Sequence, residues 1–415
     1  MKALVLAGGF PQIALIQELK HRGIEVILAD YFEAPVAREY ADRFYQVSTL
    51  DVDAIRDLAI REAVDFLITV CTDQALHTVA KVSEELGLPC YIDYQTALNV
   101  TNKQYMKKVF SGNGIPTSNY VILGEFDEDA IRGLRYPLIV KPVDCNSSKG
   151  VRRCDSIEEL KRFFAEAVAM SRTNTAVIEE YIEGDELSVD VYVEDGTAHV
   201  LCVSRSDKIA AKDKFVIFRA IWPPSVSDEI LRQIKDTAQR IADAFGIHDS
   251  PMLIQLLTDG KRVYVVEFSA RTGGGVKYLL IKRTSGFDVI KAVVDLTLGA
   301  KPHVGEVRAE QKYLINDFIY CRPGVFDHLE GFDELLREGV LRDYYLFTWK
   351  GARFSEIKAS SNRLAGYTVV GDSPEALIEK HREARRRIKA ISDSGEDMIR
   401  HDLLTDLVCR DGFVS

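Results

Sequence analysis

The stretch 254–275 constrains the fold of this chain more than any other. Two apolar runs rich in β-forming residues flank an Asp-Gly turn at 259–260, which predicts a β-hairpin. Alternation along the second run puts one set of side chains on one face (Tyr264, Val266 and Phe268) and another set on the opposite face (Val263, Val265, Glu267 and Ser269). If the turn has an odd number of residues, Gln255 falls on the same face as Glu267. An amide oxygen and a carboxylate would then face one point, which suits Mg²⁺, although an exposed hairpin with solvated polar ends has the same pattern.

Composition is that of an ordinary globular protein, long enough for two to four domains. Of the 415 residues, 47% are hydrophobic and 28% are charged. The net charge of −10 and the absence of a concentrated Lys/Arg patch argue against a nucleic-acid-binding protein. No apolar run approaches the roughly 18 residues of a membrane helix, and the chain enters a strand without a signal-peptide pattern. The expected partners are therefore small molecules, and neither nucleic acid nor a membrane.

Cysteine and histidine spacing gives no sign of a disulfide framework or a zinc site. The seven cysteines are scattered without a Cys-x-x-Cys pair, and the eight histidines show no ligand-type spacing. An odd, scattered set of cysteines fits a reducing compartment. We therefore expect a cytoplasmic protein.

Residues 1–95 alternate between predicted strands and helices, the pattern of a parallel sheet with crossover helices. Strands are predicted at 2–7, 25–29 and 65–70, and helices at 12–22 and 52–62. The turn 7–12, with Asp30 after the next strand, partly matches a dinucleotide-binding loop, but without the third glycine it is weak evidence for a nicotinamide site. The polar loop 71–74 follows the carboxyl end of a strand, where ligands bind in such sheets. A helix cap would equally explain Asp73.

Polar groups in the middle of the chain stand at strand ends and in loops. The strand 136–142 delivers Lys141 just before a proline. The loop 144–150 is small and polar, of the kind that closes over phosphates, and a mobile surface loop would look the same. The segment 176–192 is predicted as a strand, a short linker and a second strand from Glu186. A carboxylate there can bind ribose hydroxyls while the linker backbone binds an adenine edge, although such acids are more often surface residues.

Two amphipathic helices and an α+β pattern account for the last third of the chain. Helices are predicted at 227–245 and 374–391, strands near 313–320 and 343–349, and a further apolar segment at 366–371. The residues 300–310 read as a connector. A separate C-terminal unit is therefore expected.

These polar positions together resemble the ATP-grasp superfamily in order and spacing over about residues 96–300. The positions are Lys103, Lys141, the loop 144–150, Glu180, Tyr181, Ile182, Glu186, Gln255, Glu267 and Arg271. The resemblance implies an α/β and α+β protein of three parts. They are an N-terminal Rossmann-like pre-ATP-grasp domain (1–95), an ATP-grasp domain (96–310, with a lid subdomain at about 115–180) and a small C-terminal α+β subdomain (311–415).

The resemblance also implies a role for each position. Lys103 and Lys141 would contact the phosphates of ATP, beneath a lid loop that includes Ser147, Ser148, Lys149 and Gly150. Glu180, Tyr181 and Ile182 would form the hinge against adenine, with Glu186 on the ribose. Gln255 and Glu267 would hold Mg²⁺, with Mn²⁺ as an alternative. Ser269 stands where the family usually has an asparagine ligand, and its shorter, weaker donor leaves open a direct contact or one through water.

The expected activity is that of an ATP-dependent, ADP-forming carboxylate-amine ligase. Arg271 with its glycines, and the run 362–367, look most like ligases that join amino acids, while the Gln255/Glu267 pair is similar to that of carbamoyl phosphate synthetases. A carboxylate would attack the γ-phosphate to give an acyl phosphate, and an amine would then displace phosphate. Lys141 and Arg271 would be catalytic, with Arg271 on phosphate or on the acyl group. The substrate contacts would be Arg271, Gly273 and Gly274.

Other activities fit the same resemblance. One is an ATP-grasp ligase acting on a nucleotide-precursor amine or on bicarbonate. Another is a nucleotide-binding regulator that lacks turnover, which Ser269 favours. A homodimer is common among members of the superfamily.

Overall fold

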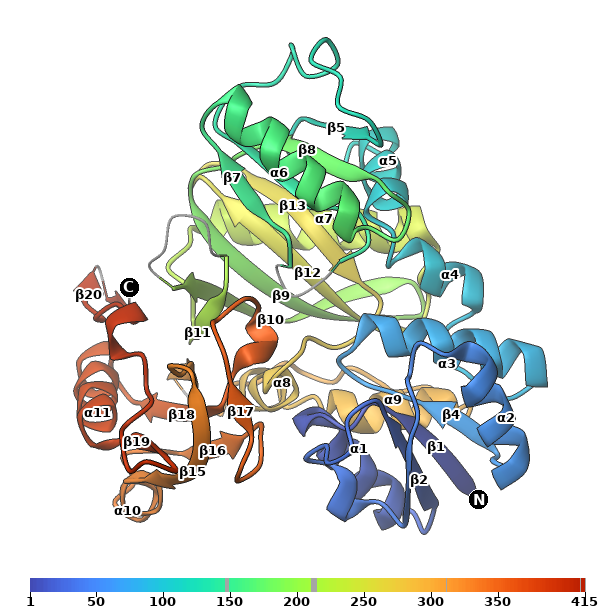
Figure 1. The fold of residues 1–415 in the computed structure, drawn as a ribbon, viewed down its shortest axis with the longest axis vertical. Coiled ribbons are helices and arrows are strands. Elements are labelled where there is room, and N and C mark those ends of the chain that lie inside the picture. Colours follow the sequence, from blue (N-terminus) through green and yellow to red (C-terminus); the bar gives the residue numbers. More distant parts are fainter. Residues whose placement is uncertain (146–148, 210–214, 311, 411, 415) are drawn as a thin grey trace.

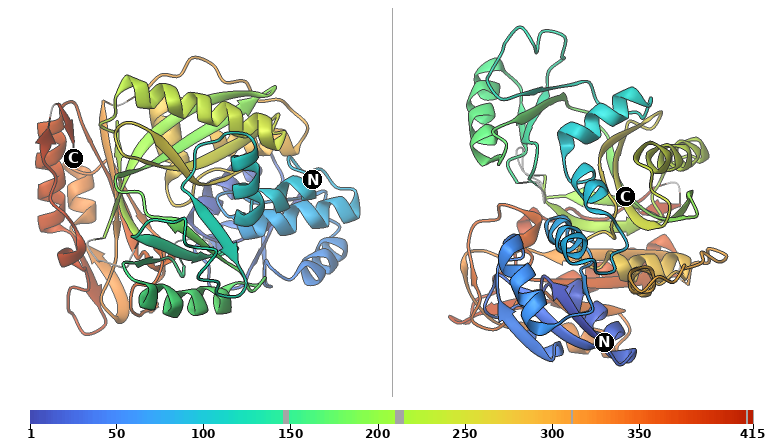
Figure 2. Two further views of the ribbon diagram at one scale, coloured as in Figure 1. Left: turned by 90° about the horizontal axis from the view of Figure 1, so that it is seen from above. Right: turned by 90° about the vertical axis from the view of Figure 1, so that its right-hand side faces the viewer.

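The three largest sheets organise the chain in the computed structural model, which describes all residues except 146–148, 210–214, 311, 411 and 415 (Figure 1). A four-stranded sheet lies in the N-terminal part, an eight-stranded sheet in the centre, and another four-stranded sheet in the lid. Seen from above, the N-terminal and C-terminal parts lie on opposite sides of the molecule (Figure 2). The predicted mixed α/β architecture with an N-terminal parallel sheet is confirmed.

The N-terminal sheet is parallel throughout, with strand order β3-β2-β1-β4. Its strands are β1 (Lys2–Leu6), β2 (Glu25–Asp30), β3 (Arg43–Gln46) and β4 (Phe66–Ile68), and its helices are α1 (Phe10–His21), α2 (Val52–Glu62) and α3 (Asp73–Leu86), with a 3-10 turn at Arg38–Tyr40. The central strands are buried on both faces, as continuous apolar runs predict. Cys71 and Asp73, which follow the carboxyl end of β4, therefore lie at one edge of this sheet.

The glycine loop after β1 is occupied by the protein's own groups. The Gly8 N–H donates to Asp30 Oδ2 at 2.6 Å, and Pro11 at the start of α1 removes another backbone donor. A Cβ at Gly8 would come within 2.6 Å of Pro35, so the chain needs a glycine there for packing. One Asp30 carboxylate oxygen therefore binds the backbone of the loop, where a dinucleotide-binding protein would use this residue to bind a ribose. The sequence evidence for a nicotinamide site was already weak.

The central sheet runs through two of the three expected parts. Its order is β13-β12-β9-β10-β11-β14-β18-β16. The strands are β9 (Asp185–Glu194), β10 (Thr197–Lys208), β11 (Ile217–Trp222), β12 (Ser250–Thr258), β13 (Val263–Ser269), β14 (Tyr313–Ile319), β16 (Asp343–Leu346) and β18 (Ala365–Gly371), accompanied by α7 (Asp228–Phe245), α8 (Lys277–Ser285) and α9 (Val289–Thr297). Strands after residue 311 therefore extend the same sheet, so the C-terminal segment is joined to the centre by backbone hydrogen bonds.

A lid stands above the central sheet (Figures 1 and 2). Its antiparallel sheet has the order β5-β8-β6-β7. The elements are β5 (Tyr120–Leu123), β6 (Leu138–Pro142), β7 (Arg152–Cys154), β8 (Ala176–Glu180) and α6 (Ile157–Met170), reached from the N-terminal part through α4 (Tyr94–Asn99) and α5 (Lys103–Gly112). Helix α6 begins after Ser156, whose hydroxyl accepts from the Glu159 N–H. The lid has its own apolar core around Leu138, Leu160 and Phe164.

The C-terminal part differs from the sequence prediction at one helix end. Helix α11 (Pro374–Arg387) was expected to reach 391, but residues 389–392 form β19 (Lys389–Ser392). The helix ends because Ile388 is extended, which lets Ala390 enter the core by pairing with β15. The remaining elements are β15 (Gly324–Glu330), α10 (Phe332–Arg337), β17 (Arg353–Phe354), β20 (Cys409–Arg410), β21 (Phe413–Val414) and 3-10 turns at Ser360–Asn362 and His401–Leu403.

The hairpin β12–β13 keeps the predicted pairing by a different route. The connection spans four residues, 259–262, so the expected odd-numbered turn is wrong. A register shift at Gln255 compensates: Leu256 pairs with Val265, whereas Gln255 pairs with Glu267. Because of this bulge, Val263 and Val265 face the core before the shift and Phe268 faces the same core after it. The predicted strict alternation along the strand is therefore wrong. Gln255 and Glu267 are nevertheless directly opposite each other.

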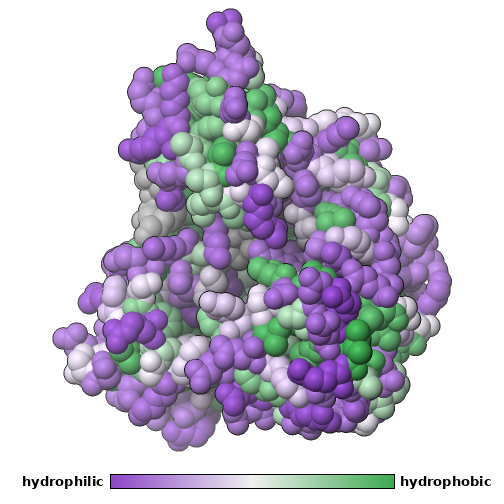
Figure 3. Space-filling view, turned by 45° about the vertical axis from the view of Figure 1, so that its right-hand side comes forward, coloured by the Kyte–Doolittle hydropathy of each residue, from purple (hydrophilic) through white to green (hydrophobic). Residues whose placement is uncertain are grey.

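The surface is mostly hydrophilic on the face shown in Figure 3, with hydrophobic atoms gathered in separate patches. Among the described residues, no helix has both the length and the apolar character needed to cross a membrane.

Candidate active site

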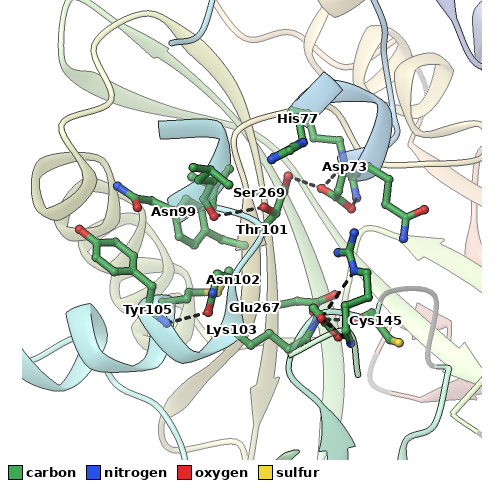
Figure 4. A pocket seen from close by; sticks show the side chains of 18 of the residues that line it. Asp73, His77, Asn99, Thr101, Asn102, Lys103, Tyr105, Cys145, Glu267 and Ser269 are labelled. Atoms are coloured by element: carbon green, nitrogen blue, oxygen red, sulfur yellow. Dashed lines mark hydrogen bonds and ion pairs between the residues drawn. The ribbon is translucent and has the colours of Figure 1, made fainter. Parts of the chain in front are cut away.

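Two cavities meet beside the hairpin β12–β13. The first, which we call the lid cavity, lies between the lid and the central sheet and has a volume of about 130 Å³. Most of the residues predicted to bind the nucleotide line it: Lys103, Lys141, Lys149, Glu180, Tyr181, Ile182, Glu186, Gln255 and Glu267. The second, the seam cavity, has a volume of about 580 Å³ and lies between α3, α4, α5 and the hairpin (Figure 4). Lys103, Cys145, Gln255 and Glu267 line both cavities.

The shared residues form a compact polar junction. Lys103 Nζ lies 3.0 Å from Glu267 Oε2 and donates to the Cys145 carbonyl oxygen at 2.7 Å. Burial alone would lower the pKa of Lys103, but the Glu267 carboxylate raises it above its usual value. Lys103 is therefore held as a cation at the boundary between the two cavities.

Lys141 belongs to a buried ion triad that the sequence analysis did not recognise as a unit. Its Nζ lies 2.5 Å from Glu179 Oε1, and Lys107 Nζ lies 2.6 Å from Glu179 Oε2. The Ser118 hydroxyl also donates to that second oxygen, at 2.7 Å. Burial would raise the pKa of Glu179, but the two lysines hold it far below its usual range. The position of an acid inside the apolar strand 176–180 was the available signal for this residue.

The predicted hinge residues differ in how they face the lid cavity. The Glu180 carboxylate turns toward Arg135, accepting bonds from its guanidinium and its backbone N–H, the latter at 3.0 Å, and the bond from the Arg135 side chain does most to lower the pKa of Glu180. The Tyr181 N–H donates to the Pro137 carbonyl oxygen at 2.9 Å. Within the described part of the chain, the Ile182 N–H has no protein acceptor. That donor is available to the edge of a base.

The predicted ribose residue and the lid loop are both near the lid cavity. Glu186 Oε2 lies 2.6 Å from Lys208 Nζ, an ion pair across β9 and β10. Lys149 lines the cavity, while Gly150 turns with φ +72° against Pro142. A side chain at Gly150 would come within 2.9 Å of that proline. Ser147 and Ser148 lie outside the described residues.

The predicted catalytic arginine is held by the N-terminal part of the chain. Arg271 donates from Nε to Asp73 Oδ1 at 2.7 Å and from Nη2 to Asp73 Oδ2, while its Nη1 donates to the Thr272 carbonyl oxygen. Burial would raise the pKa of Asp73, but Arg271 lowers it overall. The Ser269 hydroxyl donates to the same Asp73 Oδ1. Asp73 thus fixes two predicted site residues from a distant part of the sequence (Figure 4).

The predicted substrate glycines lie beside the cavities rather than in their walls. Gly273 packs so tightly that a Cβ would lie 2.8 Å from Lys277 Cγ and 3.2 Å from Asp190 Oδ1. Lys277 Nζ donates to the Ser204 hydroxyl and lies 3.6 Å from Asp190. Gly274 is exposed and faces the carbonyl oxygen of Cys71. Gly273 therefore permits close packing against Lys277 of α8 and Asp190 of β9.

The donors at the junction fit a magnesium ion that shares its coordination with a ligand. Gln255 and Glu267 offer an amide and a carboxylate oxygen from paired strands. Ser269 gives its proton to Asp73, so the lone pairs of its hydroxyl oxygen remain free to accept. The described residues contain no group of three or more His, Cys, Asp or Glu able to hold a metal. A magnesium ion here would thus take its other oxygens from phosphates and water, as this ion commonly does.

Comparison with known proteins identifies the central part of the chain. Residues 134–278 match the family described as ATP-grasp domain. The formate-dependent phosphoribosylglycinamide formyltransferase of Ignicoccus hospitalis is 27% identical over 279 residues, covering 65% of this chain and 69% of that protein. The enzyme of the same name from Wolinella succinogenes is 26% identical over 315 residues, covering 74% and 79%.

Solved structures show the same fold over nearly the whole chain. The L-amino acid ligase from Bacillus licheniformis superposes with a TM-score of 0.79 at 22% identity, covering 94% of this chain and 98% of that one. The biotin carboxylase domain of Hydrogenobacter thermophilus 2-oxoglutarate carboxylase, solved with MgADP and bicarbonate, gives a TM-score of 0.78 at 18% identity, covering 96% and 91%. The predicted resemblance is thereby confirmed at the level of fold.

Proposed function

Because residues 134–278 match the ATP-grasp domain family, we propose that this chain is an ATP-dependent, ADP-forming ligase that joins a carboxylate to an amine through an acyl phosphate. The observation that carries the proposal is the junction of Lys103, Gln255 and Glu267, where the two cavities meet. A nucleotide in the lid cavity would bring its terminal phosphate to this junction. An acid in the seam cavity would meet it there.

The charges at the junction suit phosphoryl transfer to a carboxylate. Lys103 and Lys141 would contact the phosphates, and each is already held in place by a carboxylate, so little reorganisation would be needed when the nucleotide binds. Gln255 and Glu267 would hold Mg²⁺, or Mn²⁺ in its place, and the ion would neutralise phosphate charge. Arg271 would orient the acid. The transfer breaks the bond to the β-phosphate oxygen, releases ADP, and makes the acid an electrophile that an amine can attack.

Two classes of amine are candidates for the second substrate: a nucleotide-precursor amine and an amino acid. The formyltransferase relatives favour the alternative reading of the sequence, a nucleotide-precursor amine, over the amino acid that was the main prediction. Asp30 already accepts the Gly8 N–H, so this one backbone donor of the glycine loop after β1 is engaged within the protein. A phosphoribosyl amine would need other donors for its phosphate.

The test measures ADP release by the purified full chain with Mg²⁺-ATP, a panel of acids, and hydroxylamine as a general amine that traps acyl phosphates as hydroxamates. We expect ADP and hydroxamate in equal amounts with at least one acid. Phosphoribosylamines and amino acids then replace hydroxylamine to separate the two acceptors. Nucleotide binding without acid-dependent ADP release would favour a regulator and contradict the ligase.

A further inference from the structure

The seam cavity is much larger than a one-carbon acid requires. Its volume of about 580 Å³ is within the range of pockets that enclose whole small molecules. One end is the junction at Lys103 and Glu267, and the other end reaches His77 on α3 and Asn99 on α4 (Figure 4). An acid that reacts at the junction therefore has room to extend toward α4.

At the junction end, hydrogen-bond donors remain for a carboxylate. A guanidinium has five N–H donors, and Arg271 uses three of them within the protein. Lys103 has three donors and uses two, on Glu267 and the Cys145 carbonyl oxygen. The carboxyl group of the substrate would therefore take the remaining donors of these two residues.

The carboxylates of the described cavity wall are all paired with cations of the protein. Asp73 binds Arg271, Glu267 binds Lys103, and Asp144 Oδ2 accepts the Arg172 backbone N–H at 2.9 Å, with the Arg172 guanidinium 3.6 Å away. The other oxygen of Asp144, Oδ1, is buried without a hydrogen-bond partner among the described residues, so it can accept a bond from a neutral donor of the ligand. The wall therefore carries compensated charges near the junction. A second charge on the ligand would have to compete with these pairs.

The distal end of the cavity offers neutral hydrogen-bonding groups among apolar ones. Gln95 Nε2 donates to Asn99 Oδ1 at 3.0 Å. The NH₂ group of Asn99 and the side-chain carbonyl oxygen of Gln95 therefore remain for a ligand. The Thr78 hydroxyl donates to the Thr49 carbonyl oxygen, so it can accept another bond. Burial, with Lys81 and Arg172 nearby, lowers the pKa of His77, which keeps that ring neutral. The apolar part of this end comes from Leu50, Val52 and Leu98.

We propose that the seam cavity binds the body of the acid substrate, and that this body is uncharged, polar and long enough to reach α4. A charged body would have to compete with the pair between Arg172 and Asp144, because Arg172 is the cation that the described cavity wall presents beside His77. A one-carbon acid would leave the amides unused. This inference rests on the proposed ligase function and specifies its acid.

The experiment compares acids that differ only in the body, using ADP release with hydroxylamine. The pair succinamate and succinate has nearly equal size but a neutral or a charged end, D-gluconate adds a hydroxyl-rich body, and formate and acetate have none. We expect kcat/KM for the neutral polar acids to exceed that for succinate and formate by about tenfold or more, because a second carboxylate would compete with the Arg172–Asp144 pair and a one-carbon acid would leave the polar groups unused.

A variant that fills the distal end tests the location. In Asn99→Trp, the larger ring would occupy the cavity beside Gln95, so we expect kcat/KM for the preferred acid to fall while that for acetate stays within about twofold. The matched control is Thr96→Trp on the same helix, at a position outside the cavity wall. Equal losses in both variants, or no selective loss in Asn99→Trp, would overturn the inference and leave the ligase proposal intact.

The two proposals fail in different ways. A preference for formate with undiminished activity in Asn99→Trp contradicts a large neutral acid but supports a ligase. Absence of acid-dependent ADP release with every acid, while nucleotide still binds, contradicts the ligase itself. Binding of Mg²⁺-ADP, measured as an increase in the unfolding temperature of the protein, distinguishes this second case from a misfolded preparation.

Discussion

The two cavities are built in different ways. The lid cavity is lined mainly by short stretches whose members are close in sequence: the hinge 180–182 with Glu186, the paired Gln255 and Glu267, and Lys141 at a strand end. The seam cavity draws its walls from α3, α4, the start of α5, the base of the lid and the hairpin. Local motifs therefore specify one cavity, whereas the assembly of distant segments specifies the other.

This contrast has a chemical reason. A nucleotide presents the same phosphates, ribose and base to any protein, so its contacts recur as short patterns that a sequence can reveal. The acid is the variable partner, and its binding surface is made where domains meet. Substitutions in the lid cavity should therefore change the use of ATP, and substitutions in the seam cavity should change the use of the acid. A substitution at the junction should change both.

The largest effect is expected at the junction. Glu267→Ala removes a carboxylate that holds Lys103 and faces Gln255, so ADP release should fall by about 10²–10³-fold for every acid. The matched control is Glu183→Ala, which removes an exposed carboxylate close to the hinge and should leave the rate near that of the native chain. Initial-rate measurements over a range of Mg²⁺ concentrations check the result. A loss confined to one class of acid would contradict the shared role.

A large effect on stability is expected under the lid cavity. Glu179→Gln leaves the Lys107 and Lys141 charges buried without their carboxylate, which should lower the free energy of unfolding by about 3–5 kcal/mol. Replacing Lys107 as well, in Lys107→Met/Glu179→Leu, removes one of these two buried charges and should recover part of the loss. Urea unfolding of the three proteins measures both steps. Equal stability of Glu179→Gln and the native chain would show that the triad is not a stabilising unit.

Sequence reasoning succeeded where one ligand or one periodicity dictates the pattern. Helix α2 was predicted with its observed bounds because Asp51 caps it and apolar residues recur on one face. The partnership of Asp73 with Arg271 could not be predicted, since these residues are 198 positions apart and only the packing of the N-terminal sheet joins them. The bulge beside Gln255 also escaped prediction because alternation carries no mark of an extra residue.

An intermediate, pH-dependent effect is expected at the seam cavity. Asp73→Asn keeps the shape but weakens the hold on Arg271, so KM for the acid should rise about tenfold while ATP affinity is unchanged. The lost charge-assisted bonds should also cost about 2 kcal/mol of stability at neutral pH.

The sign of the pH dependence follows from the lowered pKa of Asp73. A carboxyl group with a depressed pKa in the folded state stabilises the protein above its unfolded pKa, 3.8, and loses this contribution as pH falls toward the lower folded pKa. The difference in stability between the native chain and Asp73→Asn should therefore be full at pH 7 and shrink below pH 3.8. A difference that grows on acidification would contradict the assignment of the ion pair.

The smallest effect is expected at the outer rim of the lid cavity. Arg135 binds Glu180 but its side chain is 85% exposed, so solvent already competes for the pair. Arg135→Ala should raise KM for ATP by less than about threefold and leave the preference among acids unchanged, because Glu180 still accepts the backbone N–H of residue 135. Titration of ATP at saturating acid measures the change. A large loss, or any shift in acid preference, would show that the two cavities are coupled through the hinge and not only through the junction at Glu267.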